Sequence, residues 1–220
     1  MIDSEQQEGA PRRGWGLAAF FVPRRQFWGL PLLLDVNILV YVAMVASGLG
    51  VMEFDVRDLV DWGANFRPAL EGWGWLRLLT STFVHGGLIH IAMNMYGLLI
   101  AGVLIAPAAR NARLILCYLI CGAAGSAASA FMHAEVVSVG ASGAIFGLFG
   151  MLFALLMLGD GRFRAQRKSL LSNAAFVIAL NLGLSFAIPG IDASAHIGGL
   201  IAGFFLGVLF YFLDRREVAF

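Results

Sequence analysis

Charged residues are scarce in this chain, and their scarcity excludes an ordinary soluble domain. Only 13% of the 220 residues are Asp, Glu, Lys or Arg, whereas 60% are hydrophobic. A soluble domain usually carries about a quarter charged residues, so this composition favours a membrane protein. The net charge of +1 gives no indication of a nucleic-acid partner, and we expect none.

Cysteine is almost absent as well. Cys117 and Cys121 are the only two, and they lie four residues apart in an apolar stretch. A disulfide framework or a zinc site needs more cysteines, or other spacings, than this chain has. We therefore expect two small, buried side chains on one face of a helix.

No clear signal peptide opens the chain. The apolar stretch at residues 17–22 is only six residues long, ends at a proline and two arginines, and is followed by no clear cleavage site. Without a targeting segment, the inner membrane of a bacterial cell is the expected location. We interpret residues 1–28 as a cytoplasmic tail that lies along the membrane surface through Trp15, Phe20, Phe21 and Trp28.

The sequence contains several long stretches that are apolar and uncharged. A membrane-spanning helix needs about 20 mostly apolar residues. Six stretches without Asp, Glu, Lys or Arg come near that length or exceed it, at residues 36–52, 78–109, 114–134, 136–159, 169–191 and 193–213.

The first stretch can extend upstream over residues 30–34. The second is too long for one span, so we expect its helix to begin near Gly87 and to end before Pro107. The sequence thus predicts an all-α membrane protein. Its six-helix bundle covers residues 29–214, with a long outer first loop, and a short cytoplasmic tail follows at 215–220.

Basic residues indicate how the spans are oriented. Of the 15 Lys and Arg residues, 12 lie before span one, between spans two and three, between spans four and five, or after span six. Cytoplasmic segments carry the excess of Lys and Arg, so these four segments belong on one side. The protein is therefore predicted to be multi-pass, with both termini in the cytoplasm. The remaining three basic residues, Arg57, Arg67 and Arg77, lie in the first loop.

Four polar side chains are predicted to share one layer of the membrane. Spans two, four and six all begin at the outer face. Their first turns carry His90 and Asn94, then Ser142, then His196. Polar groups are costly at this depth, so they point either to function or to contacts between helices.

Ser142 lies among small residues, in Gly140-Ala141-Ser142-Gly143. Small neighbours leave room for a substrate backbone, and a serine at a helix start has unpaired N–H groups beside it that suit an oxyanion. Close helix packing through Gly143 and Gly147 would explain the same pattern, so both interpretations stay open for this motif alone.

His196 opens a glycine-rich stretch. Gly199, Gly203 and Gly207 recur every four residues and let a neighbouring helix approach closely. Taken alone, His196 also fits a hydrogen-bonded packing residue. Close approach of the sixth span to the fourth would bring the His196 imidazole to Ser142. The imidazole could then accept the serine proton and donate it to a leaving amine.

His90 and Asn94 lie one helical turn apart on the same face. They fit either hydrogen bonds between helices or donation to an oxyanion. A metal site is a weaker alternative, because the histidines have no carboxylate nearby, and we expect no metal. His85 is expected to be structural, and no role is assigned to His133.

Three motifs in this order resemble the rhomboid family. Residues 76–90, together with Asn94, resemble its first-loop and second-helix signature, and Trp62-Gly63-Ala64 resembles another first-loop element. Residues 140–143 resemble its nucleophile motif. Residues 195–200, Ala-His-Ile-Gly-Gly-Leu, resemble its histidine motif on the last core helix. The similarity covers roughly residues 30–213.

The resemblance implies a Ser142–His196 dyad with no acidic third member. It implies an oxyanion hole made by the backbone N–H of Ser142 with the side chains of His90 and Asn94. Phe146 corresponds to an aromatic residue that packs against the catalytic imidazole. The supporting residues in these motifs are Gly140, Gly143, Phe146, Gly199 and Gly203, with Arg77 in the first loop.

The expected function is that of an intramembrane serine endopeptidase, which cleaves transmembrane-helix substrates near the outer membrane face through an acyl-enzyme. Its partners would be those substrates and the lipid bilayer, and the reaction needs no cofactor or metal. Two alternatives are a catalytically inactive rhomboid-like protein that binds transmembrane clients and a small membrane transporter. Retention of both Ser142 and His196 argues against the first, and clustering of the polar residues near one face argues against the second.

Overall fold

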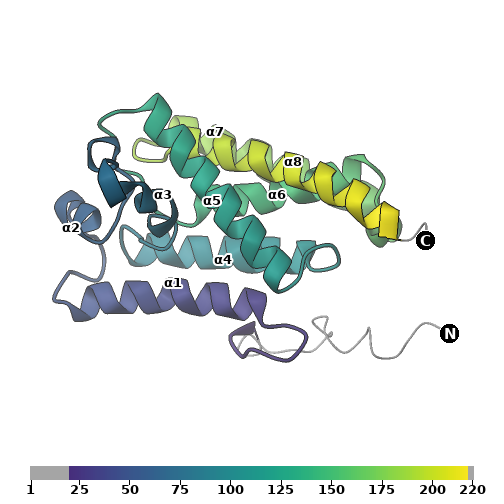
Figure 1. Ribbon diagram of the computed structural model, residues 1–220, viewed down its shortest axis with the longest axis horizontal. Coiled ribbons are helices and arrows are strands. Elements are labelled where there is room, and N and C mark those ends of the chain that lie inside the picture. The colour runs from purple at the N-terminus through teal and green to yellow at the C-terminus, as the bar shows by residue number, and fades with distance from the viewer. Residues whose placement is uncertain (1–19, 218–220) are drawn as a thin grey trace.

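The structure, a computed structural model, describes residues 20–217 as a bundle of helices (Figure 1). Five helices are long and apolar enough to span a membrane. A further apolar helix, α6 (Ser142–Met157), has 16 residues and is shorter. The predicted all-α membrane bundle is confirmed, with one of its six main helices shorter than a full span. The five long helices are α1 (Gly29–Ala46), α4 (Leu88–Ile105), α5 (Ala112–Met132), α7 (Arg167–Ala187) and α8 (Ala193–Glu217).

The long first loop is partly helical. Its elements are α2 (Val56–Asp61), η3 (Arg67–Ala69), η4 (Gly72–Leu76) and α3 (Arg77–Thr80). After this loop α4 begins at Leu88, immediately after the glycine pair that was predicted to start it. Another short helix, η5 (Gly161–Gln166), precedes α7.

Two predicted spans have boundaries that differ from those of the observed helices, one at its start and one at its end. Residues 136–141, predicted to open the fourth span, form a loop in which Ser138 and Asn65 exchange two backbone hydrogen bonds. Gly140 in this loop has φ +110°, which a right-handed helix does not contain. At the other span, α1 ends at Ala46, six residues before the predicted end.

The predicted surface tail falls mostly outside the described residues, and Trp15 is among the residues outside. Within the described part, Phe20 packs edge-on against Phe27 with ring centroids 6.4 Å apart, whereas Phe21 is exposed. The backbone N–H of Trp28 donates to Asn111 Oδ1 at 2.9 Å. The start of α1 therefore lies beside the start of α5.

A network of ion pairs joins several elements at this same end of the bundle. Arg113 in α5 and Arg162 in η5 both bind Asp214 near the end of α8, with N–O distances of 3.0 and 2.7 Å. Arg162 also binds Asp160 at 2.6 Å. The segments predicted to share one side of the membrane are therefore together in the structure, at the right of Figure 1.

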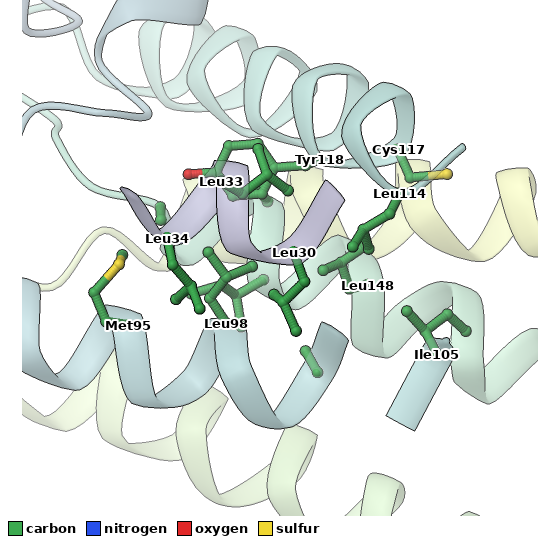
Figure 2. Close-up of a cluster of buried hydrophobic side chains, with 14 of the residues drawn as sticks. Leu30, Leu33, Leu34, Met95, Leu98, Ile105, Leu114, Cys117, Tyr118 and Leu148 are labelled. Carbon is green, nitrogen blue, oxygen red and sulfur yellow. The ribbon is translucent and has the colours of Figure 1, made fainter. Parts of the chain in front are cut away.

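The central helix α6 is buried along most of its length, with 13 of its 16 residues inaccessible. Its Leu148 belongs to an apolar cluster with Leu30 of α1, Leu98 of α4 and Tyr118 of α5 (Figure 2). A helix that is apolar on all sides belongs inside such a bundle. Because its neighbours surround it, α6 holds its first residue, Ser142, in a fixed position.

Glycines let α8 approach α6 closely. A Cβ atom at Gly199 would collide with the carbonyl oxygen of Gly143, and one at Gly203 with that of Gly147. Helices that meet through such small residues can bring their backbones into contact. The predicted close approach is present, and it sets the distance between the first turns of α6 and α8.

Both cysteines are buried in α5 as free thiols. The Sγ atom of Cys117 lies 3.6 Å from Met151 Sδ of α6, and the Cys121 side chain lies against Gly147, where a Cβ would overlap it. The prediction of small, buried side chains at these two positions is confirmed.

Candidate active site

Ser142 and His196 meet at the end of the bundle opposite the ion pairs. Ser142 is the first residue of α6, and His196 is the fourth residue of α8. The distance from Ser142 Oγ to His196 Nε2 is 2.8 Å, within hydrogen-bond range. The hydroxyl and the imidazole are therefore arranged so that a proton can pass between them.

Two neighbours fix the plane of the His196 ring. Phe146, one turn further along α6, stacks on it with ring centroids 4.3 Å apart and an interplanar angle of 17°. At the other edge of the imidazole, Ser185 Oγ of α7 lies 2.7 Å from Nδ1. His196 is only 7% exposed, and both of its ring nitrogens have a hydrogen-bond partner.

Asp192, the acidic residue nearest to His196 in the sequence, caps α8. Its Oδ1 accepts a hydrogen bond from the Ala195 N–H at 3.0 Å, and its carbonyl oxygen accepts one from the His196 N–H at 3.2 Å. A carboxylate is favoured at this end of a helix. Within residues 20–217, hydroxyl groups rather than carboxylates occupy both ring nitrogens of His196.

His90 and Asn94 face the same site from α4. The Gly86 N–H donates to His90 Nδ1 at 3.1 Å, so the neutral ring carries its proton on Nε2. A Cβ atom built at Gly140 would lie 2.7 Å from His90 Nε2 and 3.7 Å from Asn94 Nδ2. Asn94 Nδ2 also donates to the His90 carbonyl oxygen at 2.9 Å, which leaves one of its two N–H groups for another acceptor. Two potential donors therefore lie beside the backbone immediately before Ser142.

Both the backbone conformation at residue 140 and the space around it require a glycine. Its φ of +110° is one that side-chain-bearing residues rarely adopt, and any Cβ would press on the His90 ring. Its N–H donates to the Ser81 carbonyl oxygen at 2.9 Å, which anchors this turn to the first loop. A glycine here keeps space open between His90 and Ser142.

The site lies in a partly open cavity of about 980 Å³. Residues 136–140 before α6 and residues 189–192 before α8 line it together with the first turns of the helices. Polar side chains in the lining would let water occupy the cavity. They are Ser81, His90, Asn94, Ser126, His133, Ser138, Ser142, Ser185, Asp192, Ser194 and His196.

Arg77 organises the first loop. Its Nη1 donates to the carbonyl oxygens of Val60 at 2.5 Å and Ala64 at 3.2 Å. Thr80 Oγ1 donates to the Gly63 carbonyl oxygen at 2.8 Å. These bonds hold the predicted Trp-Gly-Ala element in place at the end of α2, so Arg77 acts on the loop and does not touch Ser142 or His196.

The other two histidines lie at the edge of the site. His85 is buried, packs edge-on against His90 with centroids 5.3 Å apart, and bonds through Nδ1 to the Phe83 carbonyl oxygen. Burial, with His90 adding to it, lowers the pKa of His85 to about 3, so this ring is neutral. His133 Nε2 lies 3.0 Å from Ser194 Oγ. Within residues 20–217, no three His, Cys, Asp or Glu side chains are grouped as a metal site requires.

Ser185 is a contact of His196 that the sequence motifs did not predict. It is a single serine in the second half of an apolar helix, and none of the motifs includes it. The one signal that could have identified it is its polarity at membrane depth, where a hydroxyl needs a partner.

Comparison with known proteins places these motifs in context. Residues 72–212, more than half of the chain, match the family model described as the Rhomboid domain. The chain is 38% identical over 151 residues to Rhomboid protease GluP of Bacillus subtilis (strain 168), which covers 69% of this chain and 29% of that protein. It is 37% identical over 150 residues to RHOMBOID-like protein 6, mitochondrial, of Arabidopsis thaliana, covering 68% and 47%. The chain thus matches less than half the length of either relative.

Proposed function

The chain belongs to the rhomboid family, and from this membership we propose that it is an intramembrane serine endopeptidase. Ser142 is its nucleophile and His196 its general base. Similarity to a protein named as a rhomboid protease supports the reaction class. Some members of the family are inactive, and the presence of both Ser142 and His196 favours an active one.

The reaction begins at Ser142 Oγ. His196 Nε2 accepts the hydroxyl proton as Oγ attacks the scissile carbonyl carbon, and the carbonyl oxygen becomes an oxyanion. The imidazolium then gives its proton to the leaving amine as the C–N bond breaks, which leaves an ester on Ser142. A water molecule, deprotonated by His196, hydrolyses that ester and regenerates the hydroxyl.

The oxyanion is stabilised from two helices. The N–H of Ser142, at the first position of α6, has no partner within its helix. The Nε2–H of His90 and an Nδ2–H of Asn94 approach from α4, beside Gly140. A single donor in an oxyanion hole is typically worth about 10²–10³ in kcat.

The observation that carries the proposal is the 2.8 Å distance between Ser142 Oγ and His196 Nε2 inside a partly open cavity of about 980 Å³ whose lining includes polar side chains. Hydrolysis within a membrane requires water at the nucleophile, and the cavity has room for it. A serine and a histidine sealed between packed helices would be explained by helix contact alone.

The proposed substrates are transmembrane helices cleaved near the outer membrane face. A helical substrate hides its scissile carbonyl in an i to i−4 hydrogen bond and must unwind locally, so glycine, serine or proline near the boundary favours cleavage. By resemblance to the family, a small residue is expected before the scissile bond.

Several apolar helices make the chain an integral, multi-pass membrane protein. We propose that the ion-paired end, where the basic segments gather, faces the cytoplasm with both termini, and that residues 29–214 form the catalytic domain. The relatives come from a plant as well as a bacterium. The bacterial inner membrane therefore stays a prediction.

A fluorophosphonate probe tests the proposal on purified protein in lipid. We expect wild-type protein to be labelled and to cleave a model transmembrane substrate, and Ser142→Ala to lose both properties. Ser129→Ala is the matched control, since Ser129 is a buried serine of α5 outside the cavity lining. Folded wild-type protein that is unlabelled and inert would instead identify an inactive family member that binds transmembrane clients.

A further inference from the structure

Ser185 contacts the edge of the His196 ring that faces away from Ser142. It belongs to α7, a helix with only two buried residues, Ala174 and Ser185. Ser185 is 4% exposed, and its Oγ lies 2.7 Å from His196 Nδ1. The one hydroxyl that α7 buries at this end of the bundle is therefore hydrogen-bonded to the imidazole.

The protons of this contact can be assigned by counting donors. Ser185 Oγ also lies 2.6 Å from the carbonyl oxygen of Asn181, one turn earlier in α7. A carbonyl oxygen can only accept, and a hydroxyl has one proton to give. If Ser185 gives its proton to Asn181, its lone pairs are free to accept from His196 Nδ1–H, and both contacts are satisfied.

The opposite tautomer leaves one of these contacts unmade. With the proton of His196 on Nε2, Nδ1 would be an acceptor, and Ser185 would need a second proton to keep its bond to Asn181. A buried carbonyl or ring nitrogen without a partner is costly. The arrangement thus favours the tautomer in which Nε2 carries no proton and can accept from the Ser142 hydroxyl.

We propose that Ser185 is a positioning residue, which holds His196 in the Nδ1–H tautomer and takes the place of the acidic member that the dyad lacks. This inference rests on the proposed function, because it concerns the base of the same reaction. Ser185 touches neither substrate nor the reacting atoms. When the imidazolium forms, Ser185 continues to accept from Nδ1–H, so the ring keeps its orientation through proton transfer.

Kinetics of Ser185 variants test the proposal. We expect Ser185→Ala to lower kcat about tenfold with KM within about twofold of wild type, since one net hydrogen bond no longer favours the reactive tautomer. Ser185→Thr keeps a hydroxyl that can bond back to the i−4 carbonyl, and it should restore kcat to within about threefold of wild type. Ser129→Ala serves as the control for losing a buried hydroxyl, with kcat unchanged.

The second measurement reads the tautomer directly. In bilayers, ¹⁵N spectra of histidine-labelled protein, with the His196 signals identified by comparison with His196→Ala, should report Nδ1–H in the wild type and a mixture in Ser185→Ala. Wild-type kcat in Ser185→Ala, or an unchanged Nδ1–H signal, overturns the proposal. If wild-type protein is inert but its tautomer depends on Ser185, the proteolytic function fails and the tautomer assignment stands.

Discussion

Replacing Gly203 by alanine should separate α6 from α8 and disconnect Ser142 from His196, the two members of the proposed dyad. A Cβ atom at Gly203 would overlap the carbonyl oxygen of Gly147 and press on the Cα and carbonyl carbon of the same residue. Backbone atoms cannot rotate aside as a side chain can. The two helices would have to part by at least about 1.6 Å before the new methyl reaches ordinary van der Waals distance.

That separation exceeds what the dyad can absorb. The 2.8 Å distance between Ser142 Oγ and His196 Nε2 would lengthen to roughly 4 Å, outside hydrogen-bond range. A misplacement of about 1 Å can cost about 100-fold in rate, so we expect at least that loss in labelling by a fluorophosphonate. Overpacking costs about 1–3 kcal/mol and the better helix propensity of alanine returns about 1 kcal/mol, which leaves a net cost of up to about 2 kcal/mol, so the apparent Tm should fall by up to roughly 8 °C.

A glycine of another helix provides the matched control. Gly183 lies inside α7, and no atom outside the adjoining residues and the local helix backbone lies within 4 Å of the position that a Cβ atom would occupy there, so Gly183→Ala should keep full labelling and an equal or higher apparent Tm. Labelling rates and thermal unfolding would be measured for both variants in the same lipid. If Gly203→Ala reacts at the wild-type rate, the spacing of α6 and α8 does not control the dyad, and this reasoning fails.

Three further predictions concern the surroundings of the site. Gly140→Ala should lower kcat about 10²–10³-fold by displacing the His90 donor, and a variant that keeps wild-type kcat would refute that role. Arg77→Ala should lower stability by about 1–3 kcal/mol because two loop carbonyls lose their donor, with the labelling rate of folded protein little changed. Burial raises the pKa of Asp160, but hydrogen bonds from Arg162 outweigh it and hold that pKa below its usual value. The stability contributed by Asp160 is present above its unfolded pKa of about 3.9 and lost as the pH falls further, so the apparent Tm should fall less steeply with acidification in Asp160→Asn.

The polar layer was predictable because each of its members lies a short, countable distance from a marked helix start. The glycine pair marked the start of α4, and Asp192 marked the start of α8. The chain crosses the bundle twice between the start of one of these helices and the start of the next, so the starts of α4, α6 and α8 fall at one end. His90, Ser142 and His196 then come together once glycines allow α6 and α8 to touch.

The contact with Ser185 was not predictable in the same way. α7 is apolar around most of its circumference, so its hydropathy does not indicate which face meets α8. Each residue of an α-helix advances the direction of the side chain by about 100°, so a small rotation would present another residue to His196. Packing in three dimensions, rather than any local pattern, decides this contact.

The start of α6 was misplaced for a different physical reason. Residues 136–141 are uncharged and, apart from Ser138, apolar, so by composition they continue the span. In the structure their polar backbone is satisfied by the first loop, through Asn65 and Ser81, which a single stretch of sequence does not reveal. Only Gly140 marked the break, and a glycine is also common within membrane helices.

The short length of α6 sets the depth of Ser142, the proposed nucleophile. Its 16 residues, at about 1.5 Å each, extend about 24 Å, less than the hydrocarbon core of about 30 Å. The far end of α6 leads directly to Asp160, whose ion pair with Arg162 belongs at the polar boundary. Ser142 should therefore lie about 6 Å inside the opposite boundary, a distance that also fits His196, which follows Asp192 by four residues.

Cleavage should accordingly occur about four residues inside the end of a substrate's transmembrane helix, because four residues of α-helix rise about 6 Å. A series of model substrates, each with one Gly-Ser pair moved along the helix in single-residue steps, measures this depth by mass spectrometry of the products. The yield should peak with the pair near that depth and decline when it is moved a full turn in either direction. The same series with Ser142→Ala should give no products. Cleavage confined to the segment outside the membrane, wherever the pair lies, would contradict a nucleophile held below the surface by a short central helix.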